Sequence, residues 1–289
     1  MKISGKTRVC GVIGDPIEHS LSPAIQNAAF EQLKLDYVFL AFKVKAGEAE
    51  NAMHGIRCLG IHGINVTMPH KNAVIAHLDK VDETTKFLGS VNTILNDNGK
   101  LCGFSTDGIG AVNALKENGV KLSGKKLVLL GAGGAAKAIA FAFAKEMREI
   151  ILLNRTSEKA KELTEALSKR FGKKIAGERL TPKALQKHLE GTDVLINATS
   201  VGMQPQAGQS LVAPQWLKPS LTIMDIVYDP LETKLAKDAK AAGARVVSGV
   251  EMLIYQGAAS FEAWTGYKAP IEVMRKAALS QLSMVGDER

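Results

Sequence analysis

The sequence predicts an α/β protein of two domains. Three observations support this: a length of 289 residues, a regular alternation of strand-like and helix-like segments, and a second alternating series that begins near Asp107. A chain of this length can form one large domain or two ordinary ones. Strands that alternate with helices favour a mostly parallel sheet with helices packed on it.

In the first series we expect strands at 9–14, 37–44 and 63–68, and helices at 22–33, 47–59 and 71–78. Ser22 suits the N-cap of the first helix and Pro23 its first helical position. Asn98-Gly99 lies between the apolar segments 91–95 and 101–104. Because Asn-Gly is a strong turn signal, these two segments are predicted to pair as a β-hairpin.

The second series has the same alternation. We expect strands at 126–130, 149–153, 174–179, 194–198, 222–226 and 245–248, and helices at 108–118, 135–147, 157–171, 182–189 and 231–242. Two more helical segments, 251–264 and 271–282, have no strand between them. They cannot extend the second sheet, so we expect them to pack on the first domain or on its hinge.

Composition narrows the classes of function. The formal net charge is +8 and the sequence pI about 9.3, which suits an anionic small substrate. Acidic residues lie between the lysines, and the aromatic interleaving that stacks nucleic-acid bases is missing. Glycines and Lys137 within the apolar segment 127–144 argue against a membrane span. We therefore expect neither nucleic acid nor a membrane as partner.

The cysteines indicate a compartment rather than a metal site. Cys10, Cys58 and Cys102 lie far apart in the sequence, without metal-ligand spacing. We expect no bound metal and a reduced, cytoplasmic setting.

A glycine-rich turn predicts a dinucleotide site. Gly131-Ala132-Gly133-Gly134-Ala135-Ala136 follows an apolar strand and begins an apolar helix. Gly131 permits the tight turn, Gly133 lets the backbone approach a pyrophosphate, and Ala136 allows close packing of helix on strand. The pyrophosphate is expected at the helix N-terminus, where free N–H groups favour negative charge. The second domain is therefore predicted to be Rossmann-like.

The next strand predicts which dinucleotide binds. NAD-binding proteins carry an Asp or Glu near its end, whereas this chain has Asn154-Arg155-Thr156. Arg155 offers a planar fork to a 2′-phosphate, Lys159 adds a point charge, and Asn154 and Thr156 add polar contacts. NADP is thus the expected cofactor.

Further motifs carry a resemblance to the shikimate dehydrogenase family. They are Ser20-Leu21-Ser22-Pro23, Asn65-Val66-Thr67-Met68-Pro69-His70-Lys71, Val91-Asn92-Thr93 with Ser105-Thr106-Asp107-Gly108, Tyr255-Gln256-Gly257-Ala258, and the segments 197–203 and 227–233. In the family's order they cover nearly the whole chain. The resemblance implies NADPH-dependent, reversible reduction of 3-dehydroshikimate to shikimate, in chorismate and aromatic amino acid biosynthesis.

The resemblance also implies a domain organisation. Residues 1–108 would form the substrate domain, residues 109–246 the NADP domain, and residues 247–289 the C-terminal helices that return to the substrate domain. The two domains would face a cleft that closes on the substrate.

Ketone reduction needs a hydride on carbon and a proton on oxygen, so the protein must supply an acid. Lys71 follows a strand and Pro69 at an expected helix start, from which a lysine can reach a cleft. The resemblance implies that Lys71 transfers the proton and that Asp107 is its partner and a ligand of a ring hydroxyl. Whether the ion pair raises the pKa of Lys71 more than burial lowers it stays open. His70 is expected to be structural.

The resemblance assigns the remaining site residues. Ser20 and Ser22 would bind the substrate carboxylate, with Tyr228 near it, and Thr67, Asn92 and Gln256 would bind ring hydroxyls. Met203, Ile226 and Gly249 would line the nicotinamide, and Glu83 matches a further cofactor position.

Alternatives remain open at this point. They are a quinate/shikimate dehydrogenase that uses NAD, a non-catalytic NADP-sensing protein on the same fold, and a basic nucleic-acid-binding protein, whose binding would collapse with added salt. A homodimer is also open.

Overall fold

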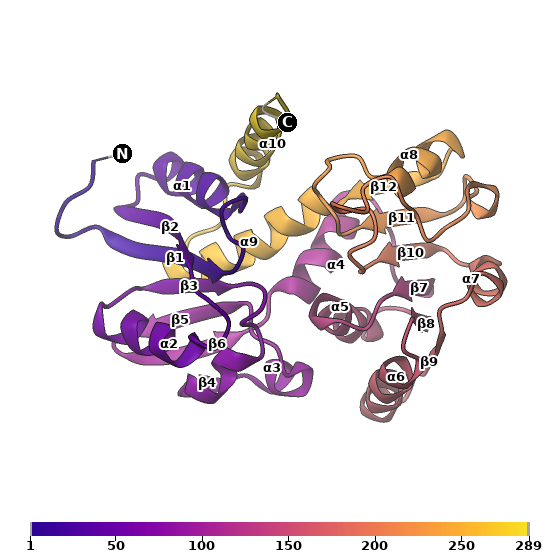
Figure 1. The fold of residues 1–289 in the computed structure, drawn as a ribbon, viewed down its shortest axis with the longest axis horizontal. Coiled ribbons are helices and arrows are strands. Elements are labelled where there is room, and N and C mark those ends of the chain that lie inside the picture. The colour runs from indigo at the N-terminus through magenta and orange to yellow at the C-terminus, as the bar shows by residue number, and fades with distance from the viewer. Residues whose placement is uncertain (1, 288–289) are drawn as a thin grey trace. The chain divides into compact units, whose positions relative to one another are not determined.

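The computed structural model describes residues 2–287, which divide into two compact units. Unit 1 holds the described residues up to Thr106 and those from Ile254, and unit 2 is Asp107–Leu253. The expected boundaries lay after residues 108 and 246, a few residues from these divisions. Each unit contains one six-stranded sheet (Figure 1).

The sheet of unit 1 has the strand order β2-β1-β3-β5-β6-β4. All its neighbours pair in parallel except at β5, which runs antiparallel to both β3 and β6. The predicted hairpin is confirmed: β5 and β6 are joined by Asn98 and Gly99, whose φ angles of 51° and 89° suit a tight hairpin turn. The strands are β1 (Arg8–Gly14), β2 (Tyr37–Lys43), β3 (Gly63–Val66), β4 (Lys80–Val81), β5 (Thr93–Asp97) and β6 (Lys100–Phe104).

Helices from both ends of the chain belong to unit 1. Phe30 of α1 stacks on Phe261 of α9 with ring centroids 5.3 Å apart, and α10 packs against α1. The C-terminal helices therefore return to the N-terminal sheet, as expected. The helices are α1 (Ser22–Gln32), α2 (Ala49–Cys58), the 3-10 helix η1 (Ala73–His77), α3 (Glu83–Leu88), α9 (Gly249–Thr265, of which the part from Ile254 lies in this unit) and α10 (Ile271–Asp287).

Two local expectations in unit 1 are wrong. Ser22 is the first residue of α1 rather than its N-cap; Leu21 is the N-cap, and the Ser20 hydroxyl accepts the Ser22 amide instead. The helix expected at 71–78 is only the short η1, and Lys71 lies in the turn before it. The backbone carbonyl of Lys71 accepts a hydrogen bond from the amide of Val91 instead of from a residue in the next helical turn.

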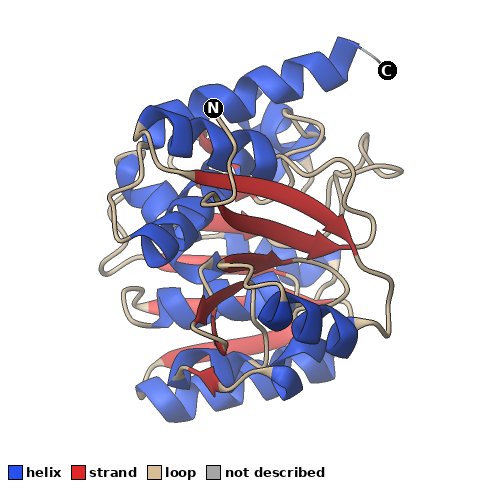
Figure 2. Ribbon diagram, turned by 90° about the vertical axis from the view of Figure 1, so that its left-hand side faces the viewer, coloured by secondary structure: helices blue, strands red, loops and turns tan. Residues whose placement is uncertain are grey.

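The sheet of unit 2 is parallel throughout, with the order β12-β11-β10-β7-β8-β9. The order reverses between β7 and β10, and ligands of such folds bind outside the carboxyl ends of strands at this point. The strands, red in Figure 2, are β7 (Lys126–Leu130), β8 (Glu149–Asn154), β9 (Lys174–Arg179), β10 (Val194–Asn197), β11 (Thr222–Asp225) and β12 (Arg245–Ser248).

The helices of unit 2 pack on this sheet: α5 contacts β7 and β8, α6 contacts β8 and β9, and α8 contacts β11 and β12. Gly177 on β9 has no room for a side chain, because an added Cβ would lie 2.5 Å from the backbone of Ala160 on α6. The helices are α4 (Asp107–Glu117), α5 (Gly134–Ala144), α6 (Ser157–Phe171), α7 (Pro182–Leu189), η2 (Pro214–Trp216) and α8 (Lys234–Ala241).

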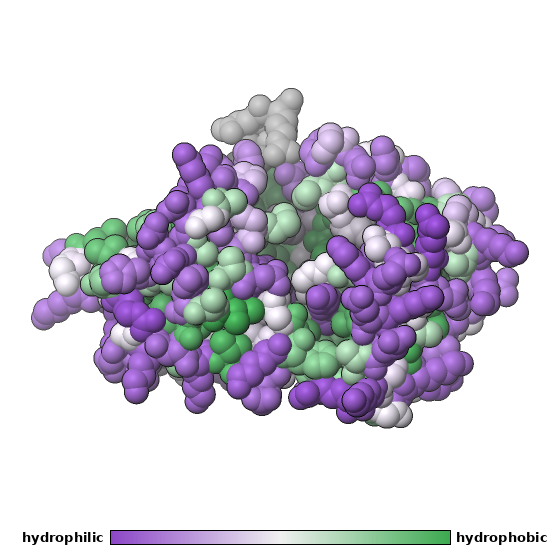
Figure 3. Space-filling view, turned by 60° about the horizontal axis from the view of Figure 1, so that its bottom comes forward, coloured by the Kyte–Doolittle hydropathy of each residue, from purple (hydrophilic) through white to green (hydrophobic). Residues whose placement is uncertain are grey.

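Each unit has its own apolar core. One cluster of buried side chains includes Ile13, Met53 and Ile94 and lies wholly in unit 1, and another includes Leu130 and Ile223 and lies wholly in unit 2. Hydrophilic side chains cover much of the face seen in Figure 3. Within residues 2–287, no helix has the length and apolar character that crossing a membrane would require.

Candidate active site

Several of the predicted substrate residues gather at one edge of the sheet of unit 1. The parallel strands β1 and β3 end there, and the antiparallel β5 begins there. The loops after β1 and β3 are joined by backbone hydrogen bonds, from Asp15 to the Met68 carbonyl (3.0 Å) and from Thr67 to the Ile13 carbonyl (3.0 Å). The backbone carbonyl of Asn92, directly before β5, accepts a hydrogen bond from the amide of Val66 (2.8 Å). The edge thus brings Thr67 and Asn92 together.

The Asn92 side chain is oriented by its neighbours. It is buried, and its Oδ1 accepts the backbone amide of Thr106 (2.8 Å) and the hydroxyl of Thr93 (3.0 Å). Its Nδ2 donates to Gln256 Oε1 on α9 (3.2 Å). Because a carbonyl oxygen has two lone pairs, these donors saturate Oδ1. Asn92 and Gln256, far apart in sequence, therefore form one amide pair.

Below this pair lies a buried polar layer that sequence reasoning missed in part. Asn65 Nδ2 donates to Ser260 Oγ (3.0 Å) and to the Asn92 carbonyl (3.1 Å). Ser260 and Thr93 share a hydrogen bond of 2.8 Å. Ser260 follows Gln256 by four residues on α9, the spacing that places two residues on the same helix face. This spacing from Gln256 is the feature of the sequence from which Ser260 could have been singled out.

The two serines lie in the loop that leads from β1 to α1. Both are half-buried, and the Ser20 hydroxyl accepts the amide of Ser22 (3.3 Å). The Ser20 amide donates to the carbonyl of Ile17, which closes a turn directly before α1. The structure thus brings the two predicted carboxylate ligands together.

Lys71 belongs to unit 1, and Asp107 is the first residue of unit 2. Lys71 is half-buried, and its carbonyl accepts the amide of Val91 (2.8 Å), which holds it beside the segment that carries Asn92. Asp107 is buried and is the first residue of α4. His70 is buried, and its Nε2 hydrogen-bonds the Val44 carbonyl (2.7 Å), in agreement with a structural role.

The glycine turn of unit 2 has the predicted geometry. Gly131 has a φ of +107°, and an added Cβ would lie 2.7 Å from the Ala198 carbonyl oxygen, so only glycine fits. Gly133 is the exposed N-cap of α5, with open space where a Cβ would be. The first turn of α5 carries no acidic residue, and Ala136 is fully buried. The helix N-terminus can therefore accept a phosphate at close range.

The end of β8 carries cations and no carboxylate at the positions that distinguish the two dinucleotides. Arg155 and Lys159 are exposed, and neither makes a hydrogen bond or ion pair with another residue among those described. Asn154 Nδ2 donates to the carbonyl of Thr156, the N-cap residue of α6 (2.9 Å). Both cations are thus available to an anionic ligand such as a 2′-phosphate.

The positions expected around the nicotinamide follow the ends of β10, β11 and β12. Met203 is exposed in the loop after β10, Ile226 directly follows β11, and Gly249 directly follows β12. An added Cβ at Gly249 would lie 2.6 Å from the carbonyl of Ile226. Burial raises the pKa of the Tyr228 phenol, and the neighbouring Asp229 raises it further.

Two acidic residues differ from what the sequence predicted. Glu83 is exposed on α3 in unit 1, and its carboxylate pairs with Lys86 (3.0 Å); the structure does not bring it into the unit that holds the other predicted cofactor residues. Asp225, at the end of β11, was not singled out from the sequence, although it is a buried carboxylate at a ligand-binding edge.

Comparisons with known proteins place the chain in a family. Residues 12–94 match the model of the shikimate dehydrogenase substrate binding domain, residues 113–227 that of shikimate/quinate 5-dehydrogenase, and residues 249–279 that of the shikimate 5′-dehydrogenase C-terminal domain. The shikimate dehydrogenase (NADP+) of Methanocaldococcus jannaschii is 43% identical over 282 residues, which cover 97% of this chain and 99% of that protein.

Solved structures agree with the sequence comparison. A crystal structure of a shikimate dehydrogenase in complex with NADP+ superposes with a TM-score of 0.91 at 42% identity, covering 97% of this chain and 98% of its own. The enzyme of Thermus thermophilus in complex with NADP(H) and shikimate has a TM-score of 0.84 at 36% identity, covering 95% and 99%. The chain therefore belongs to the shikimate dehydrogenase family of NADP-dependent oxidoreductases.

Proposed function

We propose that this protein catalyses the reversible, NADPH-dependent reduction of 3-dehydroshikimate to shikimate, a step of chorismate and aromatic amino acid biosynthesis. The observation that carries the proposal is the end of β8, where Arg155 and Lys159 replace the carboxylate of an NAD site and have no partner among the described residues. Relatives that match nearly the full length bear the name shikimate dehydrogenase (NADP+).

Unit 1, with the C-terminal helices, is the proposed substrate domain. Thr67 and the amide pair of Asn92 and Gln256 hydrogen-bond the ring hydroxyls. Sites that hydrogen-bond hydroxyls discriminate sharply, because an analogue that lacks one leaves buried polar groups unpaired. Ser20 and Ser22 bind the carboxylate, which Tyr228 also approaches.

Unit 2 is the proposed NADP domain. The turn at Gly131 and the N-terminus of α5 hold the pyrophosphate, and the end of β8 holds the 2′-phosphate. The proposed cofactor residues are Gly131, Ala132, Gly133, Gly134, Ala135, Asn154, Arg155, Thr156, Lys159, Met203, Ile226 and Gly249, with Glu83 as a further position. Bound NADPH supplies the hydride that the carbonyl carbon of the substrate accepts.

The protein supplies the proton. Lys71 donates it to the carbonyl oxygen during reduction and accepts it from the hydroxyl during oxidation. Asp107 orients the ammonium group and accepts a hydrogen bond from a ring hydroxyl. Each turnover of reduction thus adds one hydride to carbon and one proton to oxygen.

A spectrophotometric assay tests the proposal. Reduced nicotinamide is followed at about 340 nm with shikimate or quinate and with NADP+ or NAD+. We expect the highest kcat/KM for shikimate with NADP+. In Arg155→Asp the ratio of kcat/KM with NADP+ to kcat/KM with NAD+ should fall, because a carboxylate repels the 2′-phosphate. Faster turnover of quinate with NAD+ would identify the NAD-using alternative. Cofactor binding without turnover of either substrate would identify a sensor.

The proposal also covers compartment and assembly. All three cysteines are free thiols, which favours a reducing, cytoplasmic compartment. A homodimer is the assembly to test, since β2 is an edge strand with Leu40 exposed. Light scattering at several protein concentrations measures the mass; a mass of one chain throughout excludes the dimer.

A further inference from the structure

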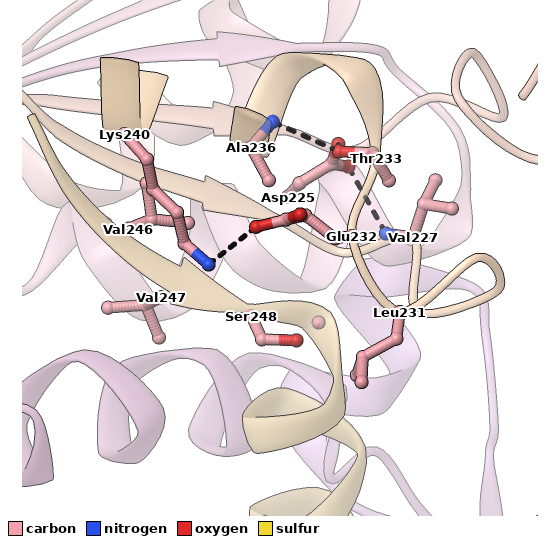
Figure 4. Close-up of a pocket in the computed structure, with 11 residues that line it drawn as sticks. Asp225, Val227, Leu231, Glu232, Thr233, Ala236, Lys240, Val246, Val247 and Ser248 are labelled. Carbon is pink, nitrogen blue, oxygen red and sulfur yellow. Dashed lines mark hydrogen bonds and ion pairs between the residues drawn. The ribbon is translucent and has the colours of Figure 1, made fainter. Parts of the chain in front are cut away.

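Asp225 is a buried carboxylate at the end of β11, with 2% of its surface exposed. Three donors from three different segments hold it. Oδ1 accepts Asn197 Nδ2 (2.9 Å) and the backbone amide of Val227 (3.2 Å), and Oδ2 accepts the Thr233 hydroxyl (2.7 Å). In Figure 4 the Thr233 hydroxyl and the Val227 amide both point at this carboxylate.

The two side-chain donors also bond to neighbouring segments. Asn197 Nδ2 also donates to the Val201 carbonyl (3.1 Å), and its Oδ1 accepts the amide and the hydroxyl of Thr199 (3.2 and 2.7 Å), which shapes the loop after β10. Thr233 is the N-cap of α8, where its Oγ1 accepts the amide of Ala236 (3.2 Å). Asp225 therefore connects the loop after β10, the loop after β11 and the start of α8.

These are the segments that carry the proposed nicotinamide positions. Ile226 directly follows Asp225, and Met203 follows Gly202, where an added Cβ would lie 3.8 Å from Asp225 Oδ2. At Gly249, after β12, an added Cβ would lie 2.7 Å from the Asp225 carbonyl oxygen. All three positions thus lie close to Asp225: Ile226 is its chain neighbour, Gly249 is next to its backbone carbonyl, and Met203 follows the glycine nearest its carboxylate.

A carboxylate is a costly choice for this position. Its hydrogen-bond donors are all neutral, and burial raises the pKa of Asp225 despite them. Burying an anion without a cationic partner costs free energy unless its hydrogen bonds compensate. A carboxylate, however, accepts several hydrogen bonds on two oxygens, which an amide side chain in the same place cannot do.

We propose that Asp225 is a positioning residue for the nicotinamide: it holds the loops after β10 and β11 so that Met203, Ile226 and Gly249 form one surface for the ring. The inference rests on the proposed NADP function. It predicts that losing the carboxylate weakens the nicotinamide half of the cofactor and leaves the adenine half bound as before.

Two ligands separate these halves: NADPH, and 2′,5′-ADP, which lacks the nicotinamide. Asp225→Asn keeps the shape but places an N–H group among donors. We expect its Kd for NADPH to rise about tenfold, the factor for one hydrogen bond to a charged group, and its Kd for 2′,5′-ADP to stay within about twofold. The fluorescence of bound NADPH should also shift toward that of free NADPH.

Asp193→Asn is the matched control. Asp193 directly precedes β10, at the amino ends of the strands of the same sheet, whereas Asp225 lies at their carboxyl ends. The Asp193 carboxylate also accepts a backbone amide, that of Lys126 (2.8 Å). Neither Kd should change. Thr233→Val and Thr233→Ser provide a second pair, in which only the serine keeps the hydroxyl. If Asp225→Asn does not fold, this pair carries the test: the valine variant should weaken NADPH alone, and the serine variant should restore it.

The outcomes are distinct. If the wild-type protein binds neither NADPH nor 2′,5′-ADP, the proposed function itself fails. If it binds both, the inference is overturned when Asp225→Asn, or the valine variant in its place, leaves both Kd values unchanged. It is equally overturned when both values rise in parallel, because Asp225 then supports the domain as a whole rather than the nicotinamide loops.

Discussion

At the scale of single residues, hydrogen bonds decide which atom a polar side chain presents. The Asn92 carbonyl oxygen is taken by the Thr106 amide and the Thr93 hydroxyl, which leaves Nδ2 as the group that faces Gln256. Gln256 accepts that bond with Oε1, and Asn92 Nδ2 also donates to the Thr106 hydroxyl (2.9 Å). These hydrogen bonds thus fix the orientation of both amide groups.

Lys71 is the residue on which the proposed chemistry depends. Lys71→Ala should lower kcat by roughly 10²–10⁴-fold, because a positioned proton donor contributes a factor of this size. The Kd for NADPH should change little, since the lysine lies outside the cofactor unit. Steady-state kinetics and fluorescence titration measure the two quantities. Lys45→Ala, at an exposed lysine of the same unit, is the control and should turn over normally. Near-normal turnover of Lys71→Ala would remove Lys71 from the mechanism.

Cys10 gives a prediction about pH. The thiol is fully buried on β1, and desolvation raises its pKa to about 12. The folded state therefore keeps a proton that the unfolded state releases above about pH 8.5, so stability falls as pH rises from there toward 12. Between pH 8.5 and 10 this loss is roughly 1.5 kcal/mol, because the slope reaches about 1.4 kcal/mol per pH unit only once the unfolded thiol is mostly ionised. Urea unfolding of wild type and Cys10→Ala at both pH values measures it. A difference between the two proteins that does not change with pH would contradict the assignment.

At the scale of elements, a glycine can mark where two helices pack closely. Gly108 on α4 faces α5, and an added Cβ would lie 2.4 Å from the Ala138 carbonyl oxygen. Gly108→Ala should therefore destabilise the protein by about 1–3 kcal/mol, the usual cost of forcing an extra methyl into a packed contact. Gly55→Ala on α2 is the matched control, because nothing lies within 4 Å of its added Cβ. It should stabilise by roughly 0.5–1 kcal/mol, because alanine favours a helix interior. Urea unfolding compares both variants with wild type, and equal effects would refute the packing argument.

The helices that the sequence predicted best have a local signal where they begin or end. Helix α7 begins as predicted because the Thr181 hydroxyl, directly before Pro182, accepts the Ala184 amide. Helix α6 ends as predicted at Phe171, because Gly172 caps it with a φ of 61°. The expected helix at 71–78 failed for a tertiary reason, since the Lys71 carbonyl bonds to Val91.

The candidate site divides in the same way. Gly131 and Arg155 could be singled out from the sequence because the turn and the strand end are local features. Ser260 and Asp225 were not singled out, because their importance depends on contacts with residues that are distant in sequence, Asn65 and Asn197 among them.

At the scale of the whole molecule, each of the two units has an apolar core of its own. The apolar clusters described above lie entirely within one unit or the other. The chain carries one tryptophan in each: Trp264 is buried in unit 1, where its Nε1 donates to the Ile94 carbonyl (3.0 Å), and Trp216 packs against the core of unit 2. Each tryptophan can therefore report the unfolding of its own unit.

This arrangement predicts how a ligand changes unfolding. A ligand that binds only the folded state stabilises it by about 2.7 kcal/mol at 100 times its Kd. We expect 2′,5′-ADP at this concentration to raise the urea midpoint reported by Trp216 in the Trp264→Phe variant. In the Trp216→Phe variant the midpoint reported by Trp264 should not move, because the glycine turn and the end of β8, which are proposed to hold the phosphates, both lie in unit 2. Inorganic phosphate at the same concentration controls for nonspecific anion effects. Equal shifts at both tryptophans would mean that the units unfold in one cooperative step, and a shift at Trp264 alone would place the ligand in the wrong unit.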